Sequence, residues 1–143
     1  MKLFIDASVA LAAAGQTTGA SRAVFDAAQT CGWELQASNY VLNEIAANLF
    51  QLPAGAEKEW QRLRSQLAIV RDLTSFEYPA VFSPGKDRPI LFTAAGWAEV
   101  LLTLDRRHFG HLFAWGFYSL KVSTPGDFLA LERKAGRYFN PAP

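Results

Sequence analysis

The sequence contains few of the residues that hold exported domains or zinc-binding domains together. A single cysteine, Cys31, and two histidines are present among 143 residues. One thiol can form no internal disulfide, and it cannot build a zinc site that needs several cysteines. We therefore expect a protein that works in a reducing compartment, with a cytoplasmic location.

Long hydrophobic runs are also missing. No segment approaches the ~20 consecutive apolar residues that a membrane-spanning helix requires. The N-terminal stretch resembles a signal peptide, because Lys2 is followed by the apolar residues 9–14. However, Asp6 interrupts an apolar region that is continuous in a signal peptide. We expect a soluble protein that is neither exported nor inserted in a membrane.

The chain has little charge of either sign in excess, with a formal net charge of +1. This value excludes a globally basic nucleic-acid-binding protein, so any basic surface must be a local patch. Hydrophobic residues make up 50% of the chain, which predicts a substantial core. The length suits one domain over residues 1–143, and we expect a flexible tail from about residue 137 to residue 143.

Two short apolar runs each end in an aspartate. Residues 100–104 are mostly aliphatic and lead to Asp105, and residues 2–5 lead in the same way to Asp6. Such runs are typical of strands that are buried on both faces inside a parallel sheet. Open α/β sheets bind their ligands at the carboxyl ends of the strands. Two central strands would thus deliver carboxylates to a shared site.

The remaining hydrophobic periodicity predicts helices that alternate with strands. This alternation is typical of a parallel, three-layer α/β sheet. The predicted strands span residues 2–6, 33–37, 68–72, 100–104 and 118–122. The predicted helices span residues 7–14, 21–30, 39–50, 57–67, 90–97, 108–116 and 124–136.

Two more carboxylates lie at helix positions, Glu44 on the flank of an apolar stripe and Asp87 at a helix start. Each acidic residue has a structural alternative. Asp87 precedes Pro89 by two residues and could cap its helix. Glu44 could be solvated, and Asp105 could initiate a turn. Asp6 is hardest to explain structurally, because a charge placed deep in a sheet needs a partner.

Taken together, the carboxylates favour a metal site. Carboxylates that converge on one edge repel each other unless a cation lies between them, and hard oxygen ligands select Mg²⁺ or Mn²⁺. Such ions bind phosphate oxygens, which favours phosphodiester hydrolysis. Ser8 and Thr103 could hydrogen-bond to the carboxylates. Alternatively, Ser8 caps a helix and Thr103 is simply a residue that favours strands.

At this point the sequence resembles the PIN-domain family. The motifs that carry the resemblance are MKLFIDAS at residues 1–8, an acidic helix residue at Glu44, KDRPI at 86–90, LTLDRRHF at 102–109 and STPGDFL at 123–129. Their order and spacing cover nearly the whole chain.

The resemblance implies a Mg²⁺- or Mn²⁺-dependent ribonuclease built on a five-stranded parallel sheet. Small bacterial members of this family are commonly VapC-type toxins, usually dimeric and held inactive by a small antitoxin. The metal ligands implied for this chain are Asp6, Glu44, Asp87 and Asp105. Ser8 and Thr103 match supporting polar positions and complete the predicted catalytic set.

Basic residues flank two of these acidic positions. We predict that they contact RNA phosphates, although solvated charged faces are the common alternative. These residues are Lys86, Arg88, Arg106 and Arg107. His108 and His111 lie three residues apart with no third type of metal ligand nearby. We therefore place His108 on the rim of the site and His111 on the surface.

Two alternatives are excluded by missing residues. A haloacid-dehalogenase-like phosphatase would need a second aspartate where Ser8 stands, and a nucleotide cofactor site would need a glycine-rich phosphate-binding motif, which is absent. A PIN-like scaffold that binds RNA or protein without catalysis remains open. The aromatic residues between Phe109 and Tyr118 favour a core or a protein interface over base stacking.

Overall fold

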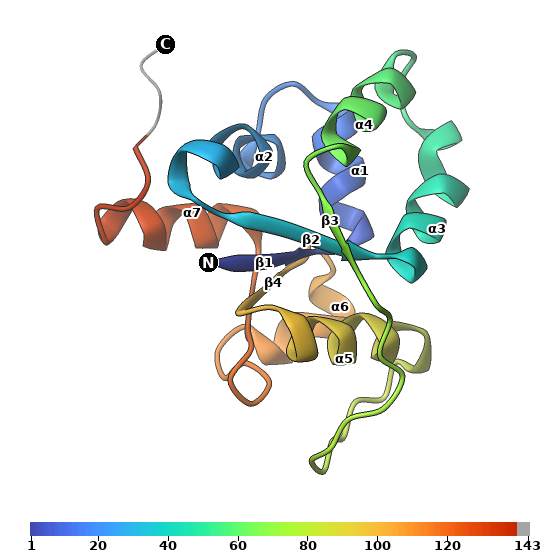
Figure 1. The fold of residues 1–143 in the computed structure, drawn as a ribbon, viewed down its shortest axis with the longest axis vertical. Helices are drawn as coiled ribbons and strands as arrows, with labels where there is room; N and C mark the ends of the chain where they lie inside the picture. Colours follow the sequence, from blue (N-terminus) through green and yellow to red (C-terminus); the bar gives the residue numbers. More distant parts are fainter. Residues whose placement is uncertain (140–143) are drawn as a thin grey trace.

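A parallel sheet forms the centre of the computed structural model, which describes residues 1–139. Five strands pair in the order β3-β2-β1-β4-β5, and each pairing is parallel (Figure 1). The predicted α/β fold with a five-stranded parallel sheet is confirmed. The strands are β1 (Lys2–Ile5), β2 (Glu34–Ser38), β3 (Ala68–Val70), β4 (Val100–Leu102) and β5 (Lys121–Ser123).

Helices cover both faces of the sheet. In Figure 1, α1, α2, α3 and α4 lie above it and α5 lies below, and α7 packs against α2. The helices are α1 (Ala7–Gly15), α2 (Ala20–Cys31), α3 (Asn39–Asn48), α4 (Ala56–Arg64), α5 (Arg88–Trp97), α6 (Arg106–Phe109) and α7 (Pro125–Lys134). Short 3-10 turns are η1 (Leu49–Gln51), η2 (Gly85–Asp87) and η3 (Gly110–Leu112).

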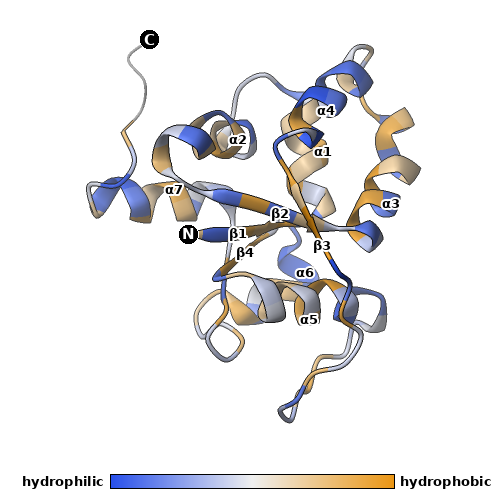
Figure 2. Cartoon of the chain, in the orientation of Figure 1, coloured by the Kyte–Doolittle hydropathy of each residue, from blue (hydrophilic) through white to orange (hydrophobic). Residues whose placement is uncertain are grey.

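The core runs through the middle strands. Leu3, Phe4 and Ile5 of β1 are all fully buried, as expected for a strand covered on both faces. Hydrophobic residues lie along the sheet, whereas α4 is largely hydrophilic on its outer side (Figure 2). Burial of this kind, at ~25 cal/mol per Å² of apolar surface, is the main source of stability for the fold.

The strand order positions the carboxyl ends of β1 and β4 for a ligand. The chain passes from β1 to β2 on one side and places β4 on the other, so β1 and β4 flank the point where the strand order reverses. Crevices at such points are where open α/β sheets bind ligands. Ile5 pairs with Leu102, and the amide of Asp6 donates to the Leu102 carbonyl at 3.0 Å.

Two predicted boundaries near the C-terminal strand were wrong. The strand expected at residues 118–122 begins only at Lys121, because Phe117 and Leu120 exchange backbone hydrogen bonds across a tight turn. In this turn Tyr118 has a φ of +54° and Gly116 a φ of +70°. A Cβ at Gly116 would lie 2.5 Å from the Leu120 carbonyl oxygen, so glycine is required there. The helix expected at residues 108–116 is instead α6 followed by η3.

The predicted flexible tail includes residues that are packed in the structure. Tyr138 is 3% exposed and its ring lies 6.0 Å from that of Trp33, measured between centroids. Arg137 forms an ion pair with Glu132 at 2.8 Å. Residues 140–143 of the predicted tail lie outside the described residues. Within residues 1–139, no helix is long and apolar enough to cross a membrane.

Candidate active site

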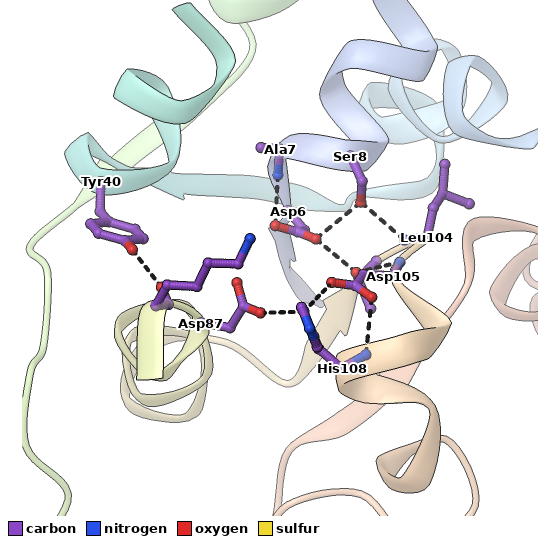
Figure 3. A network of polar contacts seen from close by, with 10 residues as sticks. Asp6, Ala7, Ser8, Tyr40, Asp87, Leu104, Asp105 and His108 are labelled. Carbon is purple, nitrogen blue, oxygen red and sulfur yellow. Dashed lines mark hydrogen bonds and ion pairs between the residues drawn. The ribbon is translucent and has the colours of Figure 1, made fainter. Parts of the chain in front are cut away.

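Asp6 is fixed by hydrogen bonds from both sides. Its Oδ1 accepts from the Ala7 amide at 2.8 Å, and its Oδ2 accepts from the hydroxyls of Ser8 at 3.0 Å and Thr103 at 2.7 Å (Figure 3). Burial raises the pKa of Asp6, although these three donors act in the opposite direction. The hydrogen bonds predicted for Ser8 and Thr103 to a carboxylate are therefore present.

The same two hydroxyls connect the turn after β1 to the turn after β4. The Leu104 amide donates to Ser8 Oγ at 3.1 Å, and the Asp105 amide donates to Thr103 Oγ1 at 3.0 Å. Each hydroxyl thus accepts a hydrogen bond from an amide of the turn after β4 and donates one to Asp6 in the turn after β1. Asp6 and Asp105 are held in a fixed relation as a result.

Asp105 has both of the roles considered for it. Its Oδ1 accepts from the His108 amide at 3.0 Å and caps α6, as the turn interpretation requires. Its Oδ2 lies 2.9 Å from Nδ1 of the His108 ring, on the side of the other carboxylates. One carboxylate therefore initiates the helix and contributes to the acidic cluster.

Asp87 does not cap its helix. It occupies the cap position of α5 but makes no side-chain hydrogen bond there, which removes the capping explanation. The residue is 4% exposed, and its Oδ2 lies 2.8 Å from His108 Nδ1. Burial raises the pKa of Asp87, and the charges of His108 and Lys86 act in the opposite direction.

His108 belongs to the acidic cluster, which sequence reasoning missed. Ligand atoms of Asp87, Asp105 and His108 all lie within 4.8 Å of one another. The spacing of His108 and His111 is not informative, because the His111 ring stacks on Phe82. The informative spacing was from Asp105 to His108, three residues that complete one helical turn.

Glu44 faces the same region from α3. Its Oε2 is buried and has no hydrogen-bond partner among the described residues. Burial raises the pKa of Glu44, and the charges of Asp6, Asp87 and Asp105 raise it further. The four predicted acidic residues therefore share one electrostatic environment, although only Asp87 and Asp105 share a close cluster with His108.

The four predicted basic residues are all exposed. Lys86 is held by the Tyr40 hydroxyl, which donates to its backbone carbonyl. Arg88 donates to the Phe82 carbonyl at 2.7 Å, and the Arg106 guanidinium lies over the Phe113 ring. Of the four, the charge of Lys86 acts on the acidic residues, because it lowers the pKa of Glu44 and of Asp87.

A large groove of about 800 Å³ lies elsewhere. It is lined by Met1, Val100, Lys121 and the exposed Trp115, among others, and includes none of the four acidic residues. Val100 and Lys121 begin β4 and β5, so this groove lies at the opposite ends of the strands from Asp6 and Asp105. The groove is therefore not part of the acidic site.

The donor set fits a divalent cation of the Mg²⁺ or Mn²⁺ type. These ions prefer hard oxygen ligands, and four carboxylates are available. The buried Glu44 Oε2 lacks a partner within residues 1–139, and raised pKa values of Asp6, Glu44 and Asp87 show that the folded protein disfavours their charged forms. A bound cation would compensate these charges.

Comparison with known proteins identifies the fold. Neither a family model nor a curated protein sequence matches the chain. Among solved structures, a chain of VapBC2 from Rickettsia felis, bound to a DNA fragment from their promoter, matches with a TM-score of 0.61 and 14% identity. The match covers 87% of this chain and 98% of that one. The chain has a PIN-like fold. At 14% identity, the similarity between this chain and the VapBC2 chain concerns the fold alone.

Proposed function

We propose that the protein is a metal-dependent endoribonuclease, which hydrolyses RNA phosphodiester bonds with Mg²⁺ or Mn²⁺. The ligands would be Asp6, Glu44, Asp87 and Asp105. The observation that carries this proposal is the convergence of carboxylates from separate segments on the carboxyl ends of β1 and β4. The charges of these groups act on each other's pKa values, and the buried Glu44 Oε2 has no hydrogen-bond partner among the described residues. The PIN-like fold supports the same function.

The residues of the chain have separable roles in this proposal. A bound divalent cation supplies Lewis-acid stabilisation of charge on the phosphoryl oxygens. Ser8 and Thr103 orient Asp6, and His108 positions the carboxylates of Asp87 and Asp105 relative to each other. Exposed basic side chains at the border contact neighbouring phosphates. They are Lys86, Arg88, Arg106 and Arg107.

The deciding experiment is an RNA cleavage assay with purified protein in Mg²⁺, in Mn²⁺ and in EDTA. Cleavage that requires a divalent cation and stops in EDTA supports the proposal. Equal cleavage with and without EDTA contradicts the metal mechanism. A single-stranded DNA of the same sequence serves as a second substrate and tests whether the activity is specific for RNA.

One observation favours a second candidate, a PIN-like scaffold that binds RNA or a protein without cleaving it. The His108 ring contacts both Asp87 and Asp105, so two of the four carboxylates have a partner in the absence of a cation. RNA binding without cleavage under any metal condition would favour this candidate. The same assay therefore separates the two functions.

Replacing Arg106 and Arg107 together by Ala is expected to weaken RNA binding and to flatten its dependence on salt. Each phosphate contact that is lost should reduce the slope of log K against log salt by about 0.7 for a single strand, so the pair accounts for up to about 1.4. The control replaces Arg62 and Arg64 on α4, which lies on the far side of the sheet from α5. An unchanged slope for the first variant would return these arginines to a solvated surface.

We further propose a toxin of a type II toxin–antitoxin pair, with a small antitoxin as partner and a homodimer as the usual state. The structural similarity to a chain of a VapBC2 complex supports this proposal. Large apolar side chains are unusually exposed, including Val81 at 94%, Trp115 at 89% and Phe50 at 80%. Burial of such side chains against a partner would remove apolar surface from water.

We expect sedimentation at micromolar concentration to give the mass of a dimer or of a complex with a co-purifying small protein. We would then replace Trp115 by Ser, and separately Phe50 by Ser. Only the substitution of a side chain that is buried in the interface between the subunits should shift the association equilibrium toward monomer. A monomer with no bound partner at all concentrations would contradict the association.

A further inference from the structure

Ser38 has a buried hydroxyl group that the fold does not use. This last residue of β2 is fully buried, and its Oγ has no hydrogen-bond partner among the described residues. It also precedes α3 at the cap position, where a serine normally accepts a hydrogen bond from the first turn, yet no such bond forms. A buried hydroxyl without a partner is costly, so its retention needs an explanation.

The register of the sheet places this hydroxyl beside Asp6. Phe4 of β1 pairs with Gln36 of β2, so two residues further along Asp6 corresponds to Ser38. Side chains two residues apart lie on the same face of a strand, and neighbouring strands are about 4.8 Å apart. On the opposite side of β1, Ile5 pairs with Leu102, so Asp6 corresponds to Thr103 in the same way.

The contact between Thr103 and Asp6 confirms that residues in register on neighbouring strands place their side chains side by side here. Thr103 donates to Asp6 Oδ2 at 2.7 Å across one strand boundary. Ser38 occupies the equivalent position across the other boundary but makes no such bond. The three residues therefore form a row across the carboxyl ends of β2, β1 and β4, with a bonded hydroxyl on one flank and an unbonded one on the other.

The unbonded flank holds a second orphan oxygen. Ser38 ends β2, and Glu44 follows in α3 with its buried Oε2 also unpartnered within residues 1–139. The opposite flank is saturated, because Ser8 and Thr103 both bond to Asp6 and to backbone amides. Two buried oxygens without a hydrogen-bond partner among the described residues therefore lie on the two sides of the junction between β2 and α3.

We propose that Ser38 is a further positioning residue of the cation site and contacts the shell of oxygen ligands on the Glu44 side. This inference rests on the proposed function. Serine and threonine hydroxyls are established hard-oxygen partners for Mg²⁺ in phosphate-transferring proteins. The Ser38 hydroxyl does not cap α3, so it is available for a polar contact beside Asp6.

The test measures Mn²⁺ binding to the full-length protein by titration calorimetry, together with melting curves in EDTA. Ser38→Ala should weaken Mn²⁺ binding by about tenfold, the lower end of effects for residues that support metal ligands. Ser38→Thr, which keeps the hydroxyl, should restore most of the affinity. Ser21→Ala, at a buried serine of α2, is the matched control and should leave binding unchanged.

The melting curves separate this role from a structural one. Removing an unpartnered buried hydroxyl should leave the Tm of the metal-free protein unchanged or raise it. A capping serine would give a lower Tm, and that result would overturn the inference. Equal Mn²⁺ affinity for wild type and Ser38→Ala would also overturn it while leaving the proposed function intact. If wild type itself does not bind Mn²⁺, the proposed function fails and the inference fails with it.

Discussion

Replacing Asp6 by Asn should reduce RNA cleavage by about a thousandfold or more. Asp6 is buried and accepts three hydrogen bonds, and the change removes a proposed cation ligand while keeping the size of the side chain. A loss of about 4 kcal/mol of transition-state stabilisation corresponds to this factor, and metal ions contribute several kcal/mol of this kind. Initial rates with saturating Mn²⁺ measure the effect.

The Asp6 variant must be shown to remain folded. The Asn carbonyl oxygen can still accept from Thr103 and Ser8, but its NH2 group cannot accept from the Ala7 amide, so we expect an unchanged circular dichroism spectrum with a modestly lower Tm. Asp26→Asn is the control, because Asp26 is an exposed carboxylate on α2 that is paired with Arg22. A folded Asp6→Asn protein with more than a tenth of wild-type activity would exclude Asp6 as an essential ligand.

Replacing Asp87 by Asn should stabilise the metal-free protein and remove most of its response to metal. Asp87 is buried beside other carboxylates and makes no helix-capping bond, so its charge costs more in the folded state than it contributes. A gain of roughly 1 kcal/mol corresponds to about 3 °C in Tm for a chain of this size. Wild type should gain about 2.7 kcal/mol at a Mn²⁺ concentration of a hundred times Kd, and the variant much less.

The stabilisation by Asp87→Asn should depend on pH in a defined direction. The folded-state pKa of Asp87 is raised, so its carboxyl group contributes stability below the unfolded pKa of about 3.9 and loses that contribution as pH rises through the folded pKa. In EDTA, the Tm difference between variant and wild type should therefore be small near pH 4 and largest at pH 8.

Asp127→Asn provides the contrast for this series. Asp127 is exposed in the first turn of α7, where a negative charge interacts favourably with the helix dipole. Removing this charge should lower Tm slightly and leave the response to metal unchanged. If Asp87→Asn behaves in the same way as Asp127→Asn, the charge of Asp87 is not strained in the folded state, and it does not belong to a shared acidic pocket.

The sheet and its two aspartates could be predicted because their signals are local. Three apolar residues directly before Asp6, and a similar run before Asp105, are typical of strands buried on both faces, and the strand order then brings their ends together. The sequence also predicted that Thr103 hydrogen-bonds to a carboxylate, and the strand register in the structure identifies that carboxylate as Asp6. These inferences use only the period of the strand and the direction of parallel pairing.

Other parts of the site depend on tertiary placement and could not be read from the chain. His108 contacts Asp87 only because the one-turn helix α6 and the start of α5 meet in space, and no local pattern encodes that meeting. Capping propensity suggested a structural role for Asp87, but its side chain makes no capping hydrogen bond and contacts His108 instead. For Ser38, the relevant fact is a missing hydrogen bond, which only coordinates can reveal.

The hydroxyl bridges between the β1 and β4 turns also affect when activity can arise during synthesis. Translation delivers Asp6 and Ser8 first, but Thr103 and Asp105 leave the ribosome only after most of the chain has been made. Until then, Asp6 lacks both its donor from β4 and its acidic neighbours. A nascent or prematurely released fragment that stops before β4 therefore carries no assembled site, so the proposed activity requires a chain that includes β4.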